Sequence, residues 1–218
     1  MGTEDCAVRD ELIARYPHAE DGLVEFVSIL GSDGLTRGLI GPREVDRLWS
    51  RHVANSAVAE ELVSVNSTMA DVGSGAGLPG IPIALVRPDL TVILVEPLLR
   101  RATFLTEAVE RLGLADRVSI LRGRAEDVSL QVDVVTARAV APLDRLVGWT
   151  LPLATVGGTV LALKGERAEA ELALASAELE RLGGGGAQVL MVGAQVVDPP
   201  TTVVRIMKLK APRRSGRR

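Results

Sequence analysis

The residues best suited to chemistry lie in a glycine-rich segment, Asp71 to Gly80, between two apolar stretches. Glycines at Gly73, Gly75 and Gly77 permit a sharp turn with positive φ and let a ligand approach the backbone closely. Their spacing is G-x-G-x-G, whereas a loop that binds a dinucleotide pyrophosphate has G-x-G-x-x-G. Asp71 would repel a pyrophosphate but suits the ammonium group of a methionine moiety. The loop therefore favours S-adenosylmethionine over NAD as the cofactor.

A second acidic residue supports this prediction. Glu96 directly follows a predicted strand over residues 91–95. A carboxylate at that position can accept hydrogen bonds from both hydroxyls of a ribose. Glu96 and the glycine loop together predict that an adenosine-containing cofactor lies across the carboxyl edge of a sheet.

Alternating strands and helices would position these residues. The expected strands are 68–72, 91–95, 118–121, 132–137, 159–163, 188–192 and 202–209, and the expected helices include 98–112 and 168–182, the latter broken by the glycines at 183–186. Such alternation implies a parallel sheet covered on both faces. The last two strands are separated by the short segment 198–200, which permits an antiparallel pair but no parallel crossover. We therefore expect a Rossmann-like α/β fold whose mostly parallel seven-stranded sheet has one antiparallel strand at the end.

Composition and charge narrow the class of protein. Apolar residues make up 47% and charged residues 24%, which is typical of a soluble globular chain. No apolar run approaches the roughly 20 residues that span a bilayer, and the acidic N-terminus lacks a secretory signal, so we expect a cytoplasmic protein. A single cysteine, Cys6, excludes an internal disulfide and an internal C-x-x-C metal site, and we expect no metal.

The charge is unevenly distributed along the chain. Residues 1–66 hold 12 acidic and 6 basic residues, whereas residues 67–218 hold 16 acidic and 19 basic residues, for a net charge of −3. This balance argues against general, sequence-independent binding of nucleic acid. It leaves room for a local basic face on the second part of the chain.

Several motifs in order along the chain resemble one family. They are Leu39–Glu44, Arg51-His52 with Asn55-Ser56, Asp71–Pro82, Arg122–Glu126, Arg138-Ala139 and Ala162–Gly165. This ordered set resembles the ribosomal RNA small subunit methyltransferase G family, also called glucose-inhibited division protein B. Two departures are small: Asn55 and Glu96 stand where the family commonly has aspartate.

The resemblance implies an activity and a set of cofactor contacts. The family transfers a methyl group from S-adenosylmethionine to the seven-position nitrogen (N7) of one guanine in 16S ribosomal RNA. Its cofactor contacts map to Gly73, Leu78, Ala125, Glu126 and Arg138. With the residues from the loop and the second strand, the expected cofactor site is Asp71, Gly73, Ser74, Gly75, Gly77, Leu78, Glu96, Ala125, Glu126 and Arg138.

The chemistry of this reaction needs no general base. N7 of guanine carries a free lone pair at neutral pH, so the enzyme mainly holds the reacting atoms in line. Cys6 is badly placed to act as a nucleophile on a cytosine carbon. The Asp/Asn-Pro-Pro-aromatic motif of exocyclic amine methylation is also missing, because the segment 198–201 lacks the aromatic residue and lies in the wrong loop.

Arg138 is the expected positioning residue, because it ends the fourth strand, where a guanidinium can reach cofactor and substrate together. A structural arginine is the alternative. Further candidates to contact RNA are Arg51, His52, Arg124 and Lys164. For His52, on the apolar face of a helix that starts at Pro42, a packed and hydrogen-bonded core histidine is favoured. The alternative to RNA contact is an ion pair with a neighbouring acidic residue for Arg124. For Lys164 it is a surface position without a specific role.

The chain divides into an N-terminal helical extension (1–66), a methyltransferase domain (67–209) and a basic tail (210–218). We expect a monomer whose partner is 16S ribosomal RNA within the small ribosomal subunit or an assembly intermediate. Three alternatives stay open at this point: an NAD-dependent oxidoreductase, a small-molecule methyltransferase, and a non-catalytic RNA-binding or assembly factor that retains the cofactor pocket.

Overall fold

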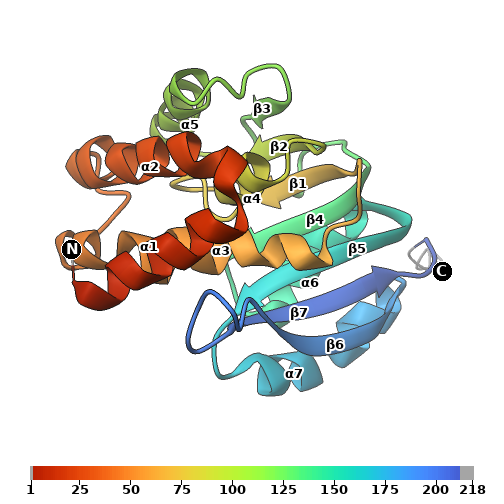
Figure 1. Cartoon of the computed structure of the whole chain (residues 1–218). Coiled ribbons are helices and arrows are strands. Elements are labelled where there is room, and N and C mark those ends of the chain that lie inside the picture. Colours follow the sequence, from red (N-terminus) through yellow and green to blue (C-terminus); the bar gives the residue numbers. More distant parts are fainter. Residues whose placement is uncertain (1, 212–218) are drawn as a thin grey trace, which may run out of the picture.

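A seven-stranded sheet forms the centre of the computed structural model, which describes residues 2–211 (Figure 1). The strands are β1 (Thr68–Val72), β2 (Thr91–Val95), β3 (Val118–Leu121), β4 (Val132–Arg138), β5 (Ala154–Lys164), β6 (Gly184–Val192) and β7 (Thr201–Lys208). Their order across the sheet is β3-β2-β1-β4-β5-β7-β6. The neighbouring pairs among β1–β5 are parallel, and β7 is antiparallel to both of its neighbours. The predicted Rossmann-like sheet with one antiparallel strand is confirmed.

The antiparallel strand is last in the chain but not at the edge of the sheet. β7 pairs with β5 on one side and with β6 on the other, so β6 forms the edge. The segment 193–200, which joins β6 to β7, is too short to cross over the sheet, and β7 therefore returns beside β6 in the opposite direction.

Helices precede the sheet and alternate with its strands. The α-helices are α1 (Thr3–Arg15), α2 (Glu20–Ile29), α3 (Asn55–Ala57), α4 (Gly80–Val86), α5 (Leu99–Arg111), α6 (Leu143–Thr150) and α7 (Ala168–Arg181). Short 3-10 segments are η1 (Pro17–Ala19), η3 (Pro42–Arg47), η5 (Val58–Leu62) and η6 (Leu151–Leu153), and π-helical segments are η2 (Leu30–Gly34) and η4 (Leu48–Ala54). The helix predicted to start at Pro42 thus begins as a 3-10 segment and continues as a π-helix.

Two strands begin earlier than the sequence pattern predicts. β5 starts at Ala154 rather than at 159, and β6 starts inside the glycine run that was expected only to break the preceding helix. A Cβ on Gly184 would lie 2.9 Å from the Leu151 side chain, and one on Gly185 would lie 2.5 Å from Leu209. Glycine is needed there because the strand passes close to its neighbours, a constraint that only the packed structure reveals.

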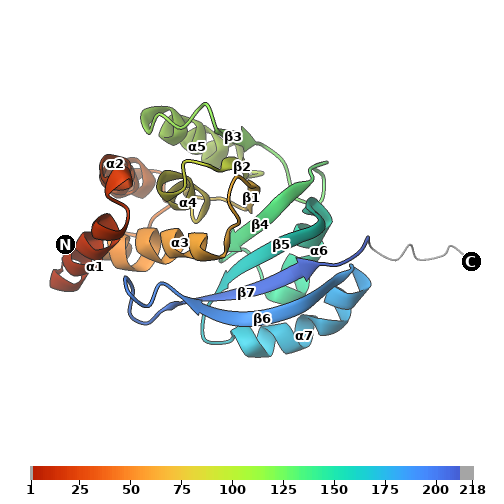
Figure 2. The same ribbon diagram turned by 45° about the vertical axis from the view of Figure 1, so that its right-hand side comes forward.

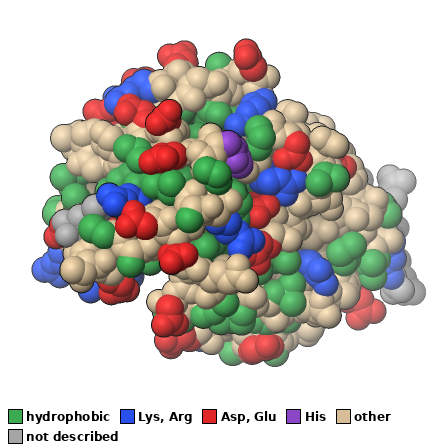
Figure 3. All heavy atoms as spheres, viewed as in Figure 1, with side chains coloured by type: hydrophobic (Ala, Val, Ile, Leu, Met, Phe, Trp, Pro, Cys, Tyr) green, Lys and Arg blue, Asp and Glu red, His purple; other side chains and the backbone are tan. Residues whose placement is uncertain are grey.

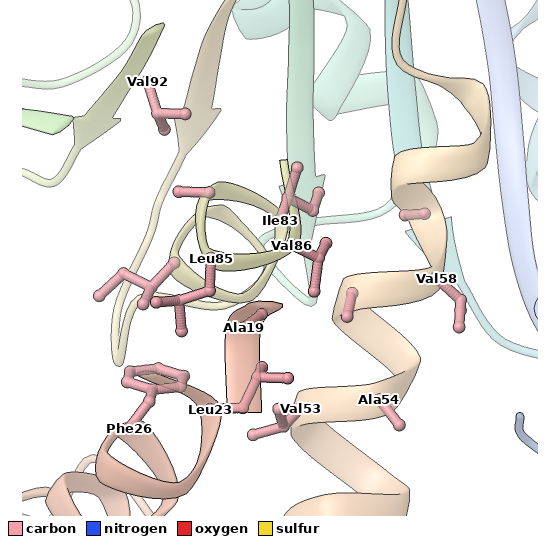
Figure 4. Packing of buried hydrophobic residues seen from close by; sticks show 14 of the residues in the cluster. Ala19, Leu23, Phe26, Val53, Ala54, Val58, Ile83, Leu85, Val86 and Val92 are labelled. Atoms are coloured by element: carbon pink, nitrogen blue, oxygen red, sulfur yellow. The ribbon is translucent and has the colours of Figure 1, made fainter. Parts of the chain in front are cut away.

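Separate apolar clusters cover the two faces of the sheet. One contains residues of α1, α2, η4, α4 and α5, and the other contains residues of α6 and α7 (Figure 2). In the first cluster, Leu23 and Phe26 of α2 pack beside Leu85 and Val86 of α4 and Val53 of η4 (Figure 4). The N-terminal helices therefore share a core with the sheet, and this core holds them over its carboxyl edge.

Two sequence-based expectations concern the basic tail and membrane-spanning segments. Of the predicted basic tail, residues 212–218 lie outside the described residues. Between residues 2 and 211, no helix is both long enough and apolar enough to cross a membrane.

Substitution of Phe26 tests the shared core. Phe26 is fully buried on α2, so we expect Phe26→Ala to lower the free energy of unfolding by roughly 3–5 kcal/mol, through lost burial and a residual cavity. Thermal and denaturant unfolding would measure the loss. Val24→Ala on the same helix is the control, because Val24 is 47% exposed and its truncation should cost no more than about 0.5 kcal/mol. Equal losses in both variants would contradict this account.

Candidate active site

The glycine loop joins β1 to α4 and is tied to the end of β2. Gly73, Gly75 and Gly77 have φ values of +71°, +55° and +87°, which favour glycine. The Gly73 N–H donates to the Val95 carbonyl at 2.8 Å, and the Gly75 N–H donates to Glu96 Oε2 at 3.0 Å. These bonds hold the loop over the carboxyl ends of β1 and β2, as the strand pattern predicts.

The space around two of these glycines differs. A Cβ on Gly73 would lie 2.8 Å from Cγ2 of Val140, so this glycine lets the loop after β4 pack against the β1 loop. At Gly75 the nearest atom to such a Cβ is the Gly73 carbonyl oxygen, 3.8 Å away. Gly75 is therefore the position where a ligand can approach the backbone of the loop.

Asp71 supplies a buried acceptor beneath the loop. Its side chain has no exposed surface, and Oδ2 accepts a hydrogen bond from the Gly80 N–H at 3.1 Å. Among the described residues, Oδ1 has no hydrogen-bond partner. Burial raises the pKa of this carboxyl to about 7. An unpartnered buried carboxylate oxygen is the acceptor that an ammonium group satisfies, so this position fits the methionine end of S-adenosylmethionine.

Glu96 is held rigidly at the end of β2. Only 1% of it is exposed; Oε1 accepts from the Leu98 N–H and Oε2 from the Gly75 N–H, both at 3.0 Å. Each carboxylate oxygen retains a further lone pair for another donor. The carboxylate thus fixes the glycine loop and can still accept from ribose hydroxyls.

Arg138, at the end of β4, reaches the N-terminal segment. Nη1 donates to the His52 carbonyl at 2.8 Å and to Ser56 Oγ at 2.7 Å, and Nη2 donates to the Arg51 carbonyl at 2.7 Å and to His52 Nδ1 at 3.2 Å. Burial and the nearby Arg51 lower the pKa of Arg138 to about 10, so the group stays charged at neutral pH. Because these bonds use all four terminal N–H groups, only Nε–H is not committed to them.

His52 connects Arg138 to Glu44. Arginine is always a donor, so Nδ1 of His52 accepts, and the proton of the neutral ring lies on Nε2, which faces Glu44 Oε2 at 3.0 Å. Burial, and then the charge of Arg138, lower the pKa of His52. The ring is therefore a packed, neutral link between the sheet and the N-terminal segment. Arg51 is 59% exposed on its side chain and pairs with Glu44 at 3.1 Å.

A large cavity lies beside this cluster. It has a volume of about 1360 Å³ and is bounded by η4, the carboxyl ends of β4 and β5, and the connection from β6 to β7. Arg51, Arg138 and Lys164 line it, which brings three of the predicted site residues together. The Lys164 ammonium is not free at the surface, because it donates to the Ala141 carbonyl at 2.7 Å and to Glu171 Oε2 at 2.8 Å.

The predicted residues Arg124, Ala125 and Glu126 lie apart from this cavity. Ala125 and Glu126 line a second cavity of about 290 Å³ with Trp149 and Pro152, and none of its lining residues belongs to the glycine loop. Arg124 is exposed on the same segment after β3. The contact of residues 125 and 126 with the cofactor thus stays a prediction.

Sequence reasoning missed residues that shape the site through distant contacts. Ser56 is fully buried and accepts from Arg138; Glu171 pairs with Lys164; and Thr201 Oγ1 donates to Asn55 Oδ1 at 2.6 Å. The only sequence signal was the place of Ser56 and Asn55 in a motif. Each partner lies at least seven residues away in the chain, so no local pattern pairs them.

Comparisons with known proteins agree with the resemblance. The family model described as rRNA small subunit methyltransferase G matches residues 19–196. The ribosomal RNA small subunit methyltransferase G of Thermobifida fusca is 58% identical over 83% of this chain and 77% of its own length, and that of Salinispora arenicola is 54% identical over 86% and 81%.

The fold has a solved counterpart. The structure of P. horikoshii TYW2 in complex with MeSAdo aligns with a TM-score of 0.55 at 17% identity, covering 78% of this chain and 64% of that one. This likeness concerns the fold alone, whereas the family model covers residues 19–196, which include the glycine loop, Glu96 and Arg138. The chain belongs to the rRNA small subunit methyltransferase G family.

Proposed function

We propose that this chain transfers a methyl group from S-adenosylmethionine to N7 of a guanine in 16S ribosomal RNA, forming 7-methylguanosine. The observation that carries the proposal is Oδ1 of Asp71, which is buried beneath the glycine loop without a hydrogen-bond partner among residues 2–211, in a chain of the rRNA small subunit methyltransferase G family. An ammonium-bearing adenosine cofactor suits this acceptor, whereas a pyrophosphate does not.

The chemistry divides simply between cofactor and protein. When bound, S-adenosylmethionine supplies a methyl group on a positively charged sulfur, which departs as a neutral thioether. The guanine N7 already carries the lone pair that forms the new bond, so the protein has no proton to remove before attack. The task of the chain is to bind, to align the reacting atoms and to exclude misaligned encounters.

The residues divide into two groups. Asp71 would receive the ammonium and Glu96 the ribose hydroxyls, while the backbone of Gly73, Ser74, Gly75, Gly77 and Leu78 would form the surface beneath the cofactor. Arg138 would contact the cofactor through Nε–H, because its other donors hold the N-terminal segment. Ala125 and Glu126 would contact the adenine, which requires the segment after β3 to lie against the glycine loop once the cofactor is bound.

The large cavity is the proposed entrance for the target guanine. It adjoins the loop after β4, which packs on Gly73, and exposed arginines such as Arg51 lie at its border. Basic and acidic side chains are interspersed over the face drawn in Figure 3, which gives no extended basic patch for backbone binding. The chain also has a net charge of −3. We propose that it acts as a cytoplasmic monomer that recognises the shape of the small ribosomal subunit or of an assembly intermediate.

A transfer assay tests the activity. Purified protein, methyl-labelled S-adenosylmethionine and small subunits that lack the modification should give label in 7-methylguanosine after digestion to nucleosides. We expect Arg138→Ala to lower the rate by at least about 100-fold through lost alignment, whereas Arg181→Ala, at an exposed position on α7, should keep it. Unfolding measurements on both variants would separate lost alignment from lost stability.

Two outcomes of the same assay would contradict the proposal. Absence of transfer to subunits and to free RNA, despite measurable cofactor binding, would favour a small-molecule methyltransferase or a non-catalytic factor. Equal rates on subunits and on protein-free 16S RNA would contradict the assembled particle as the preferred substrate.

Titration of cofactor binding tests the role of Asp71. The carboxylate must be ionised to receive the ammonium, and its pKa is about 7. The dissociation constant for S-adenosylhomocysteine should therefore fall about tenfold from pH 6 to pH 8, as the ionised fraction rises. Asp71→Asn should bind more weakly and lose this pH dependence.

A matched control is Asp89→Asn. The Arg87 guanidinium holds the pKa of Asp89 well below its usual range, so Asp89 does not titrate between pH 6 and pH 8. The variant should keep the pH dependence of the unmodified chain. A flat profile in the unmodified chain would show that Asp71 does not receive the ammonium.

A further inference from the structure

The loop from Arg138 to Leu143 joins the two halves of the site. Val140 packs against Gly73 of the cofactor loop, and residues 138–142 line the large cavity. Ala139 has a φ of +54°, a left-handed conformation that L-residues rarely adopt. A strained residue at a site persists only where its surroundings hold it, so this loop needs partners that fix its path.

Lys164 and Glu171 hold the loop from the opposite side. Lys164 ends β5, and its Nζ donates to the Ala141 carbonyl at 2.7 Å. Glu171 lies on α7, and its Oε2 accepts from the Leu143 N–H at 2.9 Å. The two side chains pair with each other at 2.8 Å. The ion pair thus binds the backbone on both sides of Pro142.

Lys164 and Glu171 are largely shielded from solvent, which strengthens their contacts with each other and with the loop. The Lys164 side chain is 9% exposed and that of Glu171 is 22% exposed. The hydrogen bond from Lys164 lowers the pKa of Glu171, so this carboxylate is charged at neutral pH. Hydrogen bonds between charged groups and backbone are stronger than neutral ones, and loss of one partner would leave the other poorly satisfied.

We propose that Lys164 and Glu171 are positioning residues, which hold the loop 138–143 in the path that aligns the guanine with the bound methyl donor. The inference rests on the function proposed above and assigns Lys164 a role other than contact with an RNA phosphate. Two of its three N–H donors are already used within the protein.

Loss of the pair should affect the transfer step more than cofactor binding. The glycine loop is held by β2 and Glu96, independently of this pair. The path of Val140 and Ala139 depends on it. Because misplacement of reacting groups by about 1 Å can cost roughly 100-fold in rate, a relaxed loop should slow the transfer step.

The test compares Lys164→Met, Glu171→Gln, the double variant and Lys164→Arg by single-turnover methyl transfer at saturating RNA and cofactor. We expect each single neutral variant to be about 10- to 100-fold slower, with the cofactor dissociation constant within about threefold. The double variant should be no slower than the worse single one, because the pair acts as a unit. Lys164→Arg should recover most of the rate. Glu178→Gln, which breaks the exposed pair with Arg181 on the same helix, is the matched control and should be unaffected.

The salt dependence of RNA binding separates the two roles of Lys164. A phosphate contact would make the slope of log affinity against log salt smaller by about one in Lys164→Met, and would leave Glu171→Gln as active as the unmodified chain. That result would overturn the proposal, as would additive losses in the double variant. The proposal is supported if the salt dependence of RNA binding is unchanged and both single variants lose methyl-transfer rate equally.

Two further measurements keep the test decisive. If Lys164→Met does not fold, Glu171→Gln carries the test alone, and a normal rate in that variant overturns the proposal. Amide hydrogen exchange at Leu143, whose N–H donates to Glu171 Oε2, needs no substrate, so it tests the pair even if the unmodified chain methylates no RNA. We expect faster exchange there in both single variants; unchanged exchange contradicts the role of the pair.

Discussion

The burial of one guanidinium controls how the parts of this structure meet. Arg138 ends β4 with its positive charge away from bulk water, and the cost of that burial is offset by carbonyl and hydroxyl acceptors on η4 and α3. The N-terminal helices must therefore sit over the carboxyl edge of the sheet in one register. In this arrangement η4 forms one side of the large cavity, and the ends of β4 and β5 form another.

Acidic and basic side chains at this edge of the sheet have three different structural roles. Asp71 is buried, and one of its oxygens has no partner within the described part of the chain, which suits a ligand cation. Glu96 is buried with both oxygens on backbone amides, which makes it a rigid support. Lys164 and Glu171 satisfy each other and two backbone groups of the loop after β4. Electrostatic positioning of this kind suits a reaction that needs alignment rather than proton transfer.

Local patterns predicted much of the fold. The strands β1, β2 and β3 begin and end where apolar runs and turn residues placed them, because buried parallel strands read as short apolar segments. The short helix α6 was missed, although its buried residues Leu143, Leu146, Val147 and Thr150 recur at helical spacing. The early starts of β5 and β6 were also missed. The register of β5 is irregular before Thr159, where Gly157 has a φ of +90°, and β6 pairs through Gly184-Gly185, where close packing leaves no room for a side chain.

The sequence by itself determined the class of fold, the glycine loop with Asp71 and Glu96, and the likeness to the methyltransferase family, because spacing within a short segment is a local property. The partners of the charged residues were decided only by the tertiary structure. Arg138 meets residues more than 80 positions earlier in the chain, and Lys164 turns inward to Ala141 and Glu171. A buried charge takes the acceptors that packing brings within hydrogen-bond distance, and no pattern along the chain specifies them.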